Sequence, residues 1–114
     1  MIRLVFALRR KPGSSREEFQ DYWLNKHAPI VASVSSDLDI LRYVQTHTLT
    51  DPANAAAQNA RGSMEPEYDG VAELWWASEA ALTANLQNEA AQKAGAVLLE
   101  DEAKFIDLPN SPLW

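Results

Sequence analysis

The sequence predicts an α+β fold with a single antiparallel β-sheet. Two observations support this prediction. Short segments rich in apolar, β-branched and aromatic residues recur at positions 2–8, 41–49, 68–76 and 104–108. Helical patterns fill the intervals between the first and second and between the third and fourth of these segments. The order strand, helix, strand, strand, helix, strand is that of the ferredoxin-like βαββαβ arrangement with a four-stranded antiparallel sheet.

The first strand and helix carry the stretch around which the chain is organised. Residues 2–8 are apolar on both faces, which is typical of a covered central strand. Ser15-Arg16-Glu17-Glu18 matches a capping box, so a helix begins here. We expect it to stop or kink near His27, because Pro29 lacks an N–H, and to continue to about Val34. Residues at steps of four and three place an apolar face and one histidine against the core: Phe19, Trp23, His27 and Ile30.

The second strand, residues 41–49, alternates so that Tyr43, Gln45 and His47 share one face. These bulky polar groups suit the lining of a pocket. The long connection that follows contains a short, alanine-rich helix, Ala53 to Arg61, which we expect to lie over an edge or a pocket mouth. Long connections in small domains are often functional, and whether this one closes as a lid is left open.

The second half of the chain completes the pattern. In the third strand, residues 68–76, Gly70 marks a bulge or a close approach of another group to the backbone. Glu73 is expected to pair with Arg3 of the first strand. Two helical segments, 79–88 and 89–99, lead to a fourth strand at 104–108, and the tail ends in an apolar ring at residue 114.

Composition limits the classes of function. With 114 residues and 46% hydrophobic composition, we expect one domain, residues 1–114, with a real core. A net charge of -6 argues against a nucleic-acid partner. The lack of cysteine excludes disulfides and thiolate chemistry. No signal peptide or membrane-length apolar segment is visible, so a cytoplasmic protein that does not bind membranes is the default expectation.

A homodimer follows from the predicted layers. Helices cover only one face of this sheet, so Val5 and Ala7 would leave apolar surface exposed on the other face. The same sheet of a second copy is the simplest cover, and two such sheets form a dimeric α+β barrel.

Several stretches together resemble one known family, the EthD family of the dimeric α+β barrel superfamily. The resemblance covers nearly the whole chain. The matching stretches are Leu8-Arg9-Arg10-Lys11-Pro12-Gly13, Ser15 to Phe19, Tyr22-Trp23, His27-Ala28-Pro29, Arg42 to His47, Tyr68 to Ser78 and Asp101 to Asp107.

The resemblance implies a dimer of ferredoxin-like subunits and a small organic substrate. The family is named after a protein required alongside an ether-degrading monooxygenase. Similar domains in polyketide-type pathways act as cofactor-free decarboxylases or cyclases, and the wider superfamily includes isomerases, monooxygenases and haem enzymes. Fold analogy therefore leaves the reaction open.

The candidate catalytic residues are His27, His47 and Tyr43. An imidazole titrates near neutral pH, so one histidine could abstract a proton while the other, or the tyrosine, stabilises an enolate. The alternative for His27 is a hydrogen-bonded histidine at a helix end, and for His47 an ordinary edge-strand residue.

Aromatic residues and one carboxylate are candidates for substrate binding. The pocket walls would come from Tyr22, Trp23, Trp75 or Trp76, although tryptophans more often form core. Asp69 could orient a histidine, although a carboxylate in a turn is the more common role.

No tight spacing of metal ligands is present, so we predict no metal site and no cofactor, with a metal bound by His27, His47 and a carboxylate as the open alternative. Three functions stay open: cofactor-independent acid–base catalysis (decarboxylation, cyclisation, isomerisation or oxidation) on a small aromatic or polyketide-like compound, a non-catalytic carrier of a hydrophobic metabolite for an oxygenase, and, as a weaker alternative, a haem-dependent oxidoreductase.

Overall fold

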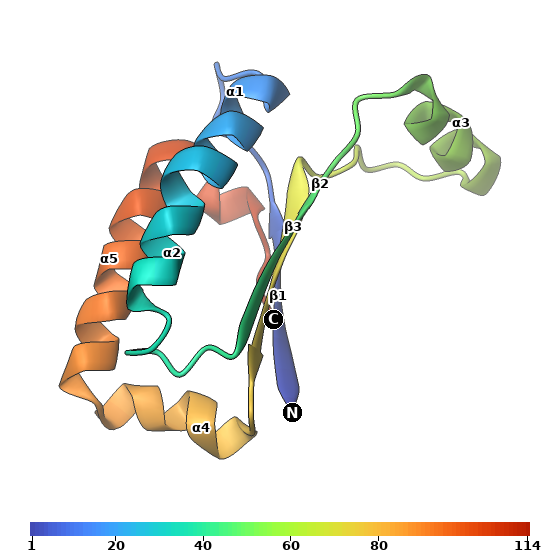
Figure 1. Ribbon diagram of the computed structural model, residues 1–114. Helices are drawn as coiled ribbons and strands as arrows, with labels where there is room; N and C mark the ends of the chain where they lie inside the picture. The colour runs from blue at the N-terminus through green and yellow to red at the C-terminus, as the bar shows by residue number, and fades with distance from the viewer.

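The chain forms an antiparallel sheet with helices packed on one face (Figure 1). The computed structural model describes all 114 residues. The strands are β1 (Ile2–Leu8), β2 (Arg42–His47) and β3 (Gly70–Trp76). The α-helices are α1 (Arg16–Tyr22), α2 (Ala28–Val34), α3 (Pro52–Arg61), α4 (Glu79–Ala84) and α5 (Glu89–Phe105). A π-helical turn, η1 (Trp23–His27), and two 3-10 turns, η2 (Asn85–Gln87) and η3 (Leu108–Asn110), complete the elements.

The strand order is β1-β3-β2, and both outer strands run antiparallel to β3. The helical stretch α1–η1–α2 connects β1 to β2 and passes over β3, which lies between them. This is the split βαβ arrangement, so the predicted α+β class and its first three strands are confirmed.

The prediction of a fourth strand at residues 104–108 is wrong, because the sheet has three strands. The buried positions of α5 continue from Ala94 at helical spacing to Asp101 and Phe105, past residue 99, and they keep α5 helical through Phe105. Ile106 makes a single bridge to Arg10.

The C-terminal tail takes the place beside β1 that a fourth strand would occupy. The Val5 N–H donates to the Trp114 carbonyl (2.8 Å), the Trp114 N–H donates to the Val5 carbonyl (3.0 Å), and the Ala7 N–H donates to the Pro112 carbonyl (3.0 Å). Pro112 has no N–H of its own, which limits this pairing to a short segment.

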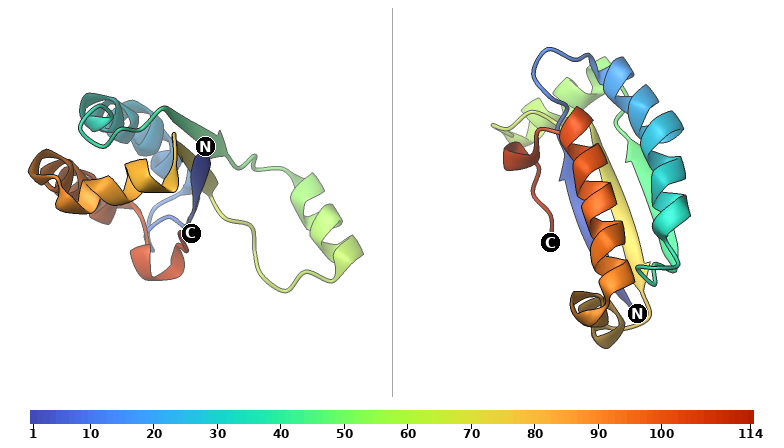
Figure 2. Two further views of the ribbon diagram at one scale, coloured as in Figure 1. Left: turned by 90° about the horizontal axis from the view of Figure 1, so that it is seen from below. Right: turned by 90° about the vertical axis from the view of Figure 1, so that its left-hand side faces the viewer.

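The helices α1, α2 and α5 lie side by side on one face of the sheet, and the other face is left open (Figures 1 and 2). The helix α3 stands away from the body on the open side (Figure 1). Asp51 caps α3, the short alanine-rich helix that the sequence predicts, and Gly62 ends it with a positive φ of 65°. No residue of α3 is buried, so it does not cover a sheet edge or a pocket mouth within this chain.

The open face combines apolar and charged side chains. Glu73 pairs with Arg3 (3.3 Å), as predicted from the sequence. Trp75 lies opposite Arg3 and Arg42 in the strand register, and both guanidinium groups lie over its ring, at 5.6 and 5.0 Å from the centroid. Val5 and Val44, which lie opposite Glu73 on the same face, are only half-buried.

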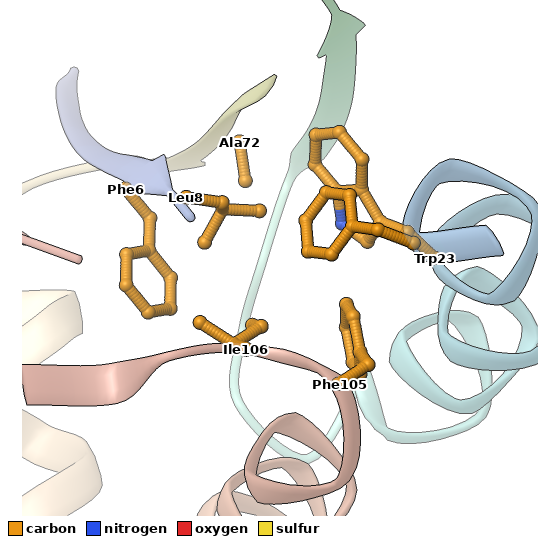
Figure 3. Close-up of a cluster of buried hydrophobic side chains, with 7 residues drawn as sticks. Phe6, Leu8, Trp23, Ala72, Phe105 and Ile106 are labelled. Carbon is orange, nitrogen blue, oxygen red and sulfur yellow. The ribbon is translucent and has the colours of Figure 1, made fainter. Parts of the chain in front are cut away.

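The main core lies between the sheet and the helices (Figure 3). It contains Phe6, Leu8, Phe19, Trp23, Ala72, Phe105 and Ile106. Trp23, Phe19 and Leu8 are each 1% exposed. A second, smaller cluster of Leu38, Ala91 and Ala94 packs at the other end of α5.

Gly70 allows Trp23 to reach the sheet. A Cβ atom at Gly70 would lie 2.7 Å from Cη2 of Trp23 and 3.0 Å from the Thr46 carbonyl oxygen. Real Cβ atoms do not approach other carbon atoms this closely, so only glycine fits beneath the indole. The close approach predicted for this strand position is thereby confirmed.

We predict that Gly70→Ala destabilises the protein by about 1–3 kcal/mol, because the added methyl group overpacks the indole. Urea denaturation measures the change. Gly95→Ala is the matched control: its Cβ would meet nothing within 4 Å, so replacing this helical glycine should stabilise by about 0.5–1 kcal/mol. A Gly70→Ala protein as stable as the wild type would contradict this account of the contact.

Candidate functional site

The turn η1 positions His27 at the core. Pro29 has no N–H to donate to the carbonyl four residues back, and the Ala28 N–H instead bonds the Trp23 carbonyl, five residues back. The helix therefore widens at this point and continues, rather than stopping. The side-chain Nε2 of Gln45 also donates to the Trp23 carbonyl (2.9 Å), which ties η1 to β2.

His27 is held by a carboxylate on the neighbouring helix. Its Nδ1 lies 2.7 Å from Oδ2 of Asp101, and the two residues are only 5% and 3% exposed. The Tyr22 hydroxyl donates to the other oxygen of Asp101 (2.7 Å). The ring of Phe105 packs against the imidazole with centroids 5.1 Å apart. Ring orientation and tautomer are therefore both fixed by contacts.

Burial and hydrogen bonds together determine which of the three side chains Tyr22, Asp101 and His27 are charged. Burial alone would raise the pKa of Asp101, but the bonds from Tyr22 and His27 outweigh burial and hold that pKa below its usual value. The same bond to Asp101 raises the pKa of Tyr22 to about 12. Burial lowers the pKa of His27, and Asp101 only partly offsets this. At neutral pH, His27 is therefore a neutral ring whose Nδ1–H donates to the carboxylate.

A small cavity adjoins His27 on the sheet side. Its volume is about 40 Å³, which is room for a few non-hydrogen atoms. Nine of its eleven lining residues are hydrophobic, Trp23 and Tyr43 among them, and the other two are His27 and Glu102. Nε2 of His27 has no hydrogen-bond partner in the protein, so its lone pair is free to accept a proton.

Tyr43 connects this cavity to the second histidine. Its hydroxyl oxygen accepts bonds from Nε1 of Trp23 (3.1 Å) and Nε2 of Gln45 (2.8 Å), which leaves its own proton free to donate. His47 Nε2 donates to Oε1 of Gln45 (2.8 Å). The path His47–Gln45–Tyr43 therefore leads to the cavity that His27 lines.

The two histidines do not line the same cavity. The His47 ring stacks on Trp23 with centroids 4.6 Å apart and faces a shallow surface hollow near Leu24 and Ala28. The Trp23 indole therefore separates it from His27. Burial lowers the pKa of His47 as well.

The remaining predicted site residues lie in different places. Tyr22 belongs to the site because its hydroxyl donates to Asp101, and Trp23 belongs to it because its ring lines the cavity. Trp75 lies on the open face of the sheet. Trp76 is 4% exposed and donates from Nε1 to the Leu38 carbonyl (2.8 Å), at the opposite end of α5 from the cavity.

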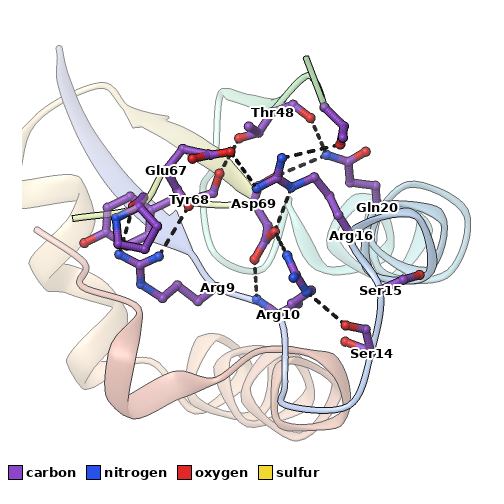
Figure 4. Close-up of polar contacts among 12 residues, drawn as sticks. Arg9, Arg10, Ser14, Ser15, Arg16, Gln20, Thr48, Glu67, Tyr68 and Asp69 are labelled. Atoms are coloured by element: carbon purple, nitrogen blue, oxygen red, sulfur yellow. Dashed lines mark hydrogen bonds and ion pairs between the residues drawn. The ribbon is translucent and has the colours of Figure 1, made fainter. Parts of the chain in front are cut away.

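Asp69 contacts no histidine and instead binds two arginines (Figure 4). It accepts from Nη1 and the backbone N–H of Arg10 and from Nε of Arg16 (2.9 Å). Burial would raise its pKa, but these donors outweigh burial and lower it. Arg16 also pairs with Glu67 (3.3 Å). This ion cluster anchors the C-terminal end of the segment that carries α3, and Nη1 of Arg16 also donates to Oγ1 of Thr50 at its start (3.4 Å).

Two residues of the site were not singled out from the sequence: Asp101 and Glu102. A signal for Asp101 exists, because it lies four residues before Phe105, at the spacing of buried helix positions. A carboxylate in such a position needs a partner, which would have pointed to a histidine. The prediction of a strand at 104–108 hid this spacing.

No three His, Cys, Asp or Glu side chains gather as a possible metal site. No helix combines the length and apolar character needed to cross a membrane.

Glu102 is the second ionisable group on the cavity. Burial, and then the nearby charge of Asp101, raise its pKa to about 7. Its pKa in the folded state thus lies above the ordinary value of 4.5, so folding takes up a proton between these pH values.

We predict that this proton uptake lowers the free energy of unfolding of the wild type as the pH rises from about 4.5 to about 7, by at most about 1.4 kcal/mol per pH unit. Glu102→Gln lacks the effect, so its stability relative to the wild type should increase across that range. Urea denaturation at several pH values measures the difference. Glu100→Gln, an exposed position on the same helix, should follow the wild-type profile. A constant difference between Glu102→Gln and the wild type would contradict the prediction.

Comparisons with known proteins identify the family. A family model described as the EthD domain matches residues 11–109. No curated protein sequence matches the chain.

Among solved structures, an EthD family protein from Bacillus halodurans C-125 aligns with a TM-score of 0.57 and 14% identity, over 100% of this chain and 97% of that one. HapK from Hahella chejuensis aligns with a TM-score of 0.57 and 12% identity, over 99% and 90%. A hypothetical protein from Arabidopsis thaliana aligns with a TM-score of 0.53 and 12% identity, over 98% and 82%. These similarities support the fold. Because the EthD model covers well over half of the sequence, the chain belongs to the EthD family.

Proposed function

We propose that the protein binds a small hydrophobic organic compound, of aromatic or polyketide-like type, and catalyses a proton transfer on it without a cofactor. The observation that carries the proposal is the series of hydrogen bonds from Tyr22 to Asp101 and from His27 to Asp101, which presents a neutral imidazole to an apolar cavity. A general base of this kind needs a fixed ring, a free nitrogen and a site shielded from water.

Each residue has a role in the proposal. His27 Nε2 accepts a proton from an acidic C–H or O–H group of the substrate. Asp101 holds the tautomer and stabilises the imidazolium that forms, and Tyr22 holds Asp101. Tyr43 donates its hydroxyl proton in a hydrogen bond to the oxygen on which charge develops. His47 acts on Tyr43 through Gln45 and is a positioning residue.

The size of the cavity limits the ligand. A volume of about 40 Å³ encloses only the reactive end of an aromatic or polyketide-like molecule. The rest of such a molecule would extend towards solvent or would require η1 and α5 to separate. Isomerisation and aldol-type cyclisation begin with a proton transfer of this kind, and decarboxylation needs one to protonate the carbon that loses CO₂, so all three stay within the proposal.

We predict that His27→Ala lowers proton transfer by about 10²–10⁴-fold, because the base is lost. Deuterium uptake from D₂O into a panel of small enolisable aromatic ketones, followed by NMR, measures it. Asp101→Asn should also reduce exchange, and His47→Ala should reduce it less, because it acts through two other side chains. Lys93→Ala, with a side chain 76% exposed on α5, is the control and should match the wild type.

Two results would count against this prediction. Exchange by His27→Ala at the wild-type rate would remove the catalytic assignment. If the wild type binds the ketones in titration calorimetry and exchanges none of them, the alternative is favoured: a non-catalytic protein that carries a hydrophobic metabolite for an oxygenase.

We further propose that two copies pair through their open sheet faces. The half-buried valines of that face, such as Val5 and Val44, support this, because helices cover only the other face.

We predict a mass in sedimentation equilibrium of twice 12.7 kDa at micromolar concentration. Val44→Glu should shift the mass towards a single chain, because it places a charge in the interface. Val97→Glu, which puts the same charge on an exposed position of α5, should not. A wild-type mass of 12.7 kDa would refute the pairing.

A further inference from the structure

Glu102 is the one ionisable group on the cavity that the proposed proton transfer does not use. It follows Asp101 on α5 and faces the cavity beside His27 and Tyr43. Its carboxyl group makes no hydrogen bond or ion pair with the protein, whereas the neighbouring Asp101 has Tyr22, His27 and Lys104 as partners. Because an unpaired carboxyl group in apolar surroundings is disfavoured as an ion, this one favours its protonated form.

The polar groups on the cavity form a definite pattern. The protonated carboxyl group of Glu102 and the Tyr43 hydroxyl are both donors without a protein acceptor. His27 Nε2 is an acceptor without a protein donor. No cation lines the cavity, and the remaining lining is apolar. A matching ligand is uncharged, has an oxygen that accepts two hydrogen bonds, and carries an acidic hydrogen nearby.

We propose that Glu102 is a second catalytic residue of this site, and that the substrate is a small neutral carbonyl compound whose oxygen contacts Glu102 and Tyr43 while His27 faces the adjacent carbon. This inference rests on the proposed function for its catalytic step. The recognition of the carbonyl oxygen by Glu102 stands apart from that step and is tested separately.

In the proposed reaction, the groups that line the cavity accept every proton that the substrate loses and supply every proton that it gains. His27 Nε2 takes a proton from the carbon next to the carbonyl, and the C–H electron pair becomes the carbon–carbon double bond. The carbonyl π pair moves to oxygen, which takes the proton of Glu102. The products are an enol, an imidazolium held by Asp101, and a Glu102 carboxylate. For exchange, the imidazolium swaps its Nε2 proton with solvent before it returns one to the same carbon; for migration, it returns the proton to a different carbon of a conjugated enol. In both cases the enol hydroxyl re-protonates Glu102.

The titratable groups around Glu102 determine the pH dependence. They are His27 from η1, Tyr43 from β2 and Asp101 from α5, while β1, β3 and α2 contribute only apolar side chains to the cavity. The rate should rise as His27 loses its proton, at a pKa below 6.5, and should fall as Glu102 ionises, at a pKa of about 7. Both required forms coexist in the interval between these values.

The first experiment is infrared difference spectroscopy of protein labelled with ¹³C-glutamate, comparing the wild type with Glu102→Gln at pH 6. We expect a carboxylic-acid C=O band in the wild type that is absent from the variant. Cyclopentanone should shift this band to lower frequency, because the acid donates to the ketone oxygen. Cyclopentane, which has no acceptor, is the matched control and should leave the band in place.

Absence of the acid band, or a band that saturating cyclopentanone does not move, overturns the proposed contact whether or not the protein is catalytic. Cyclopentylamine tests the competing ligand class. If the amine converts the acid band to a carboxylate band and the ketone does nothing, the site binds cations and the proposal fails.

The second experiment measures deuterium exchange of the α-hydrogens of cyclopentanone. Glu102→Gln still donates a hydrogen bond but transfers no proton, so we expect kcat to fall about 10²-fold with little change in KM, and the decrease in rate above pH 7 to disappear. Glu102→Leu should lose ketone binding as well. Wild-type kcat and an unchanged pH profile in Glu102→Gln would overturn the catalytic role.

The two experiments separate this inference from the proposed function. A band shift with no exchange above the His27→Ala level overturns catalysis by both residues and leaves Glu102 as the group that recognises the carbonyl. Exchange that depends on His27 but not on Glu102 leaves the proposed function in place and removes this inference alone.

Discussion

The contact between Trp23 and Gly70 is the constraint on which the site depends. The indole can lie against β3 only because glycine leaves the space, and the ring is then almost completely buried. From that position its N–H donates to Tyr43, its face stacks on His47, and its carbonyl accepts from Gln45. One side chain thus joins the first helical stretch to β2 and β3 and forms the wall between the two histidines.

The irregular turn η1 carries both Trp23 and His27 and so brings the histidine to the cavity that the indole lines. In η1 the Trp23 carbonyl accepts two hydrogen bonds, one from the Ala28 N–H five residues on and one from Nε2 of Gln45 on β2. The same turn, beside Pro29, carries His27, whose Nδ1 lies 2.7 Å from Oδ2 of Asp101 on α5. Two hydrogen-bonded chains then end at the cavity, one from Tyr22 through Asp101 to His27 and the other from His47 through Gln45 to Tyr43. The first ends in a base and the second in a donor.

The arrangement places most of the charge away from the cavity. The arginines beside Asp69 and Glu67 hold the base of the α3 segment, and the arginines beside Trp75 lie on the open face. Asp101 keeps its charge because Tyr22 and His27 donate to it, whereas Glu102, one residue later, has no donor and its pKa rises to about 7. Neighbouring carboxyl groups on one helix therefore differ in protonation because of the contacts each makes.

The sequence by itself determined the α+β class, the first three strands, the capped helix starts and the family, because periodicity, caps and turn residues are local signals. It also singled out His27, Tyr43 and Trp23. The tertiary structure decided the rest: that the carboxylate marked by the helical spacing, Asp101, meets His27, that the Trp23 indole divides the two histidines, and that Trp75 lies on the opposite face. It also decided the conformation of residues 104–108: the burial of Asp101 and Phe105 extends α5 to Phe105, and the strand predicted from the short apolar pattern does not form. These outcomes depend on contacts between residues far apart in the chain, such as Tyr22 and Asp101. A pattern within a short segment of sequence cannot show which distant residues will meet.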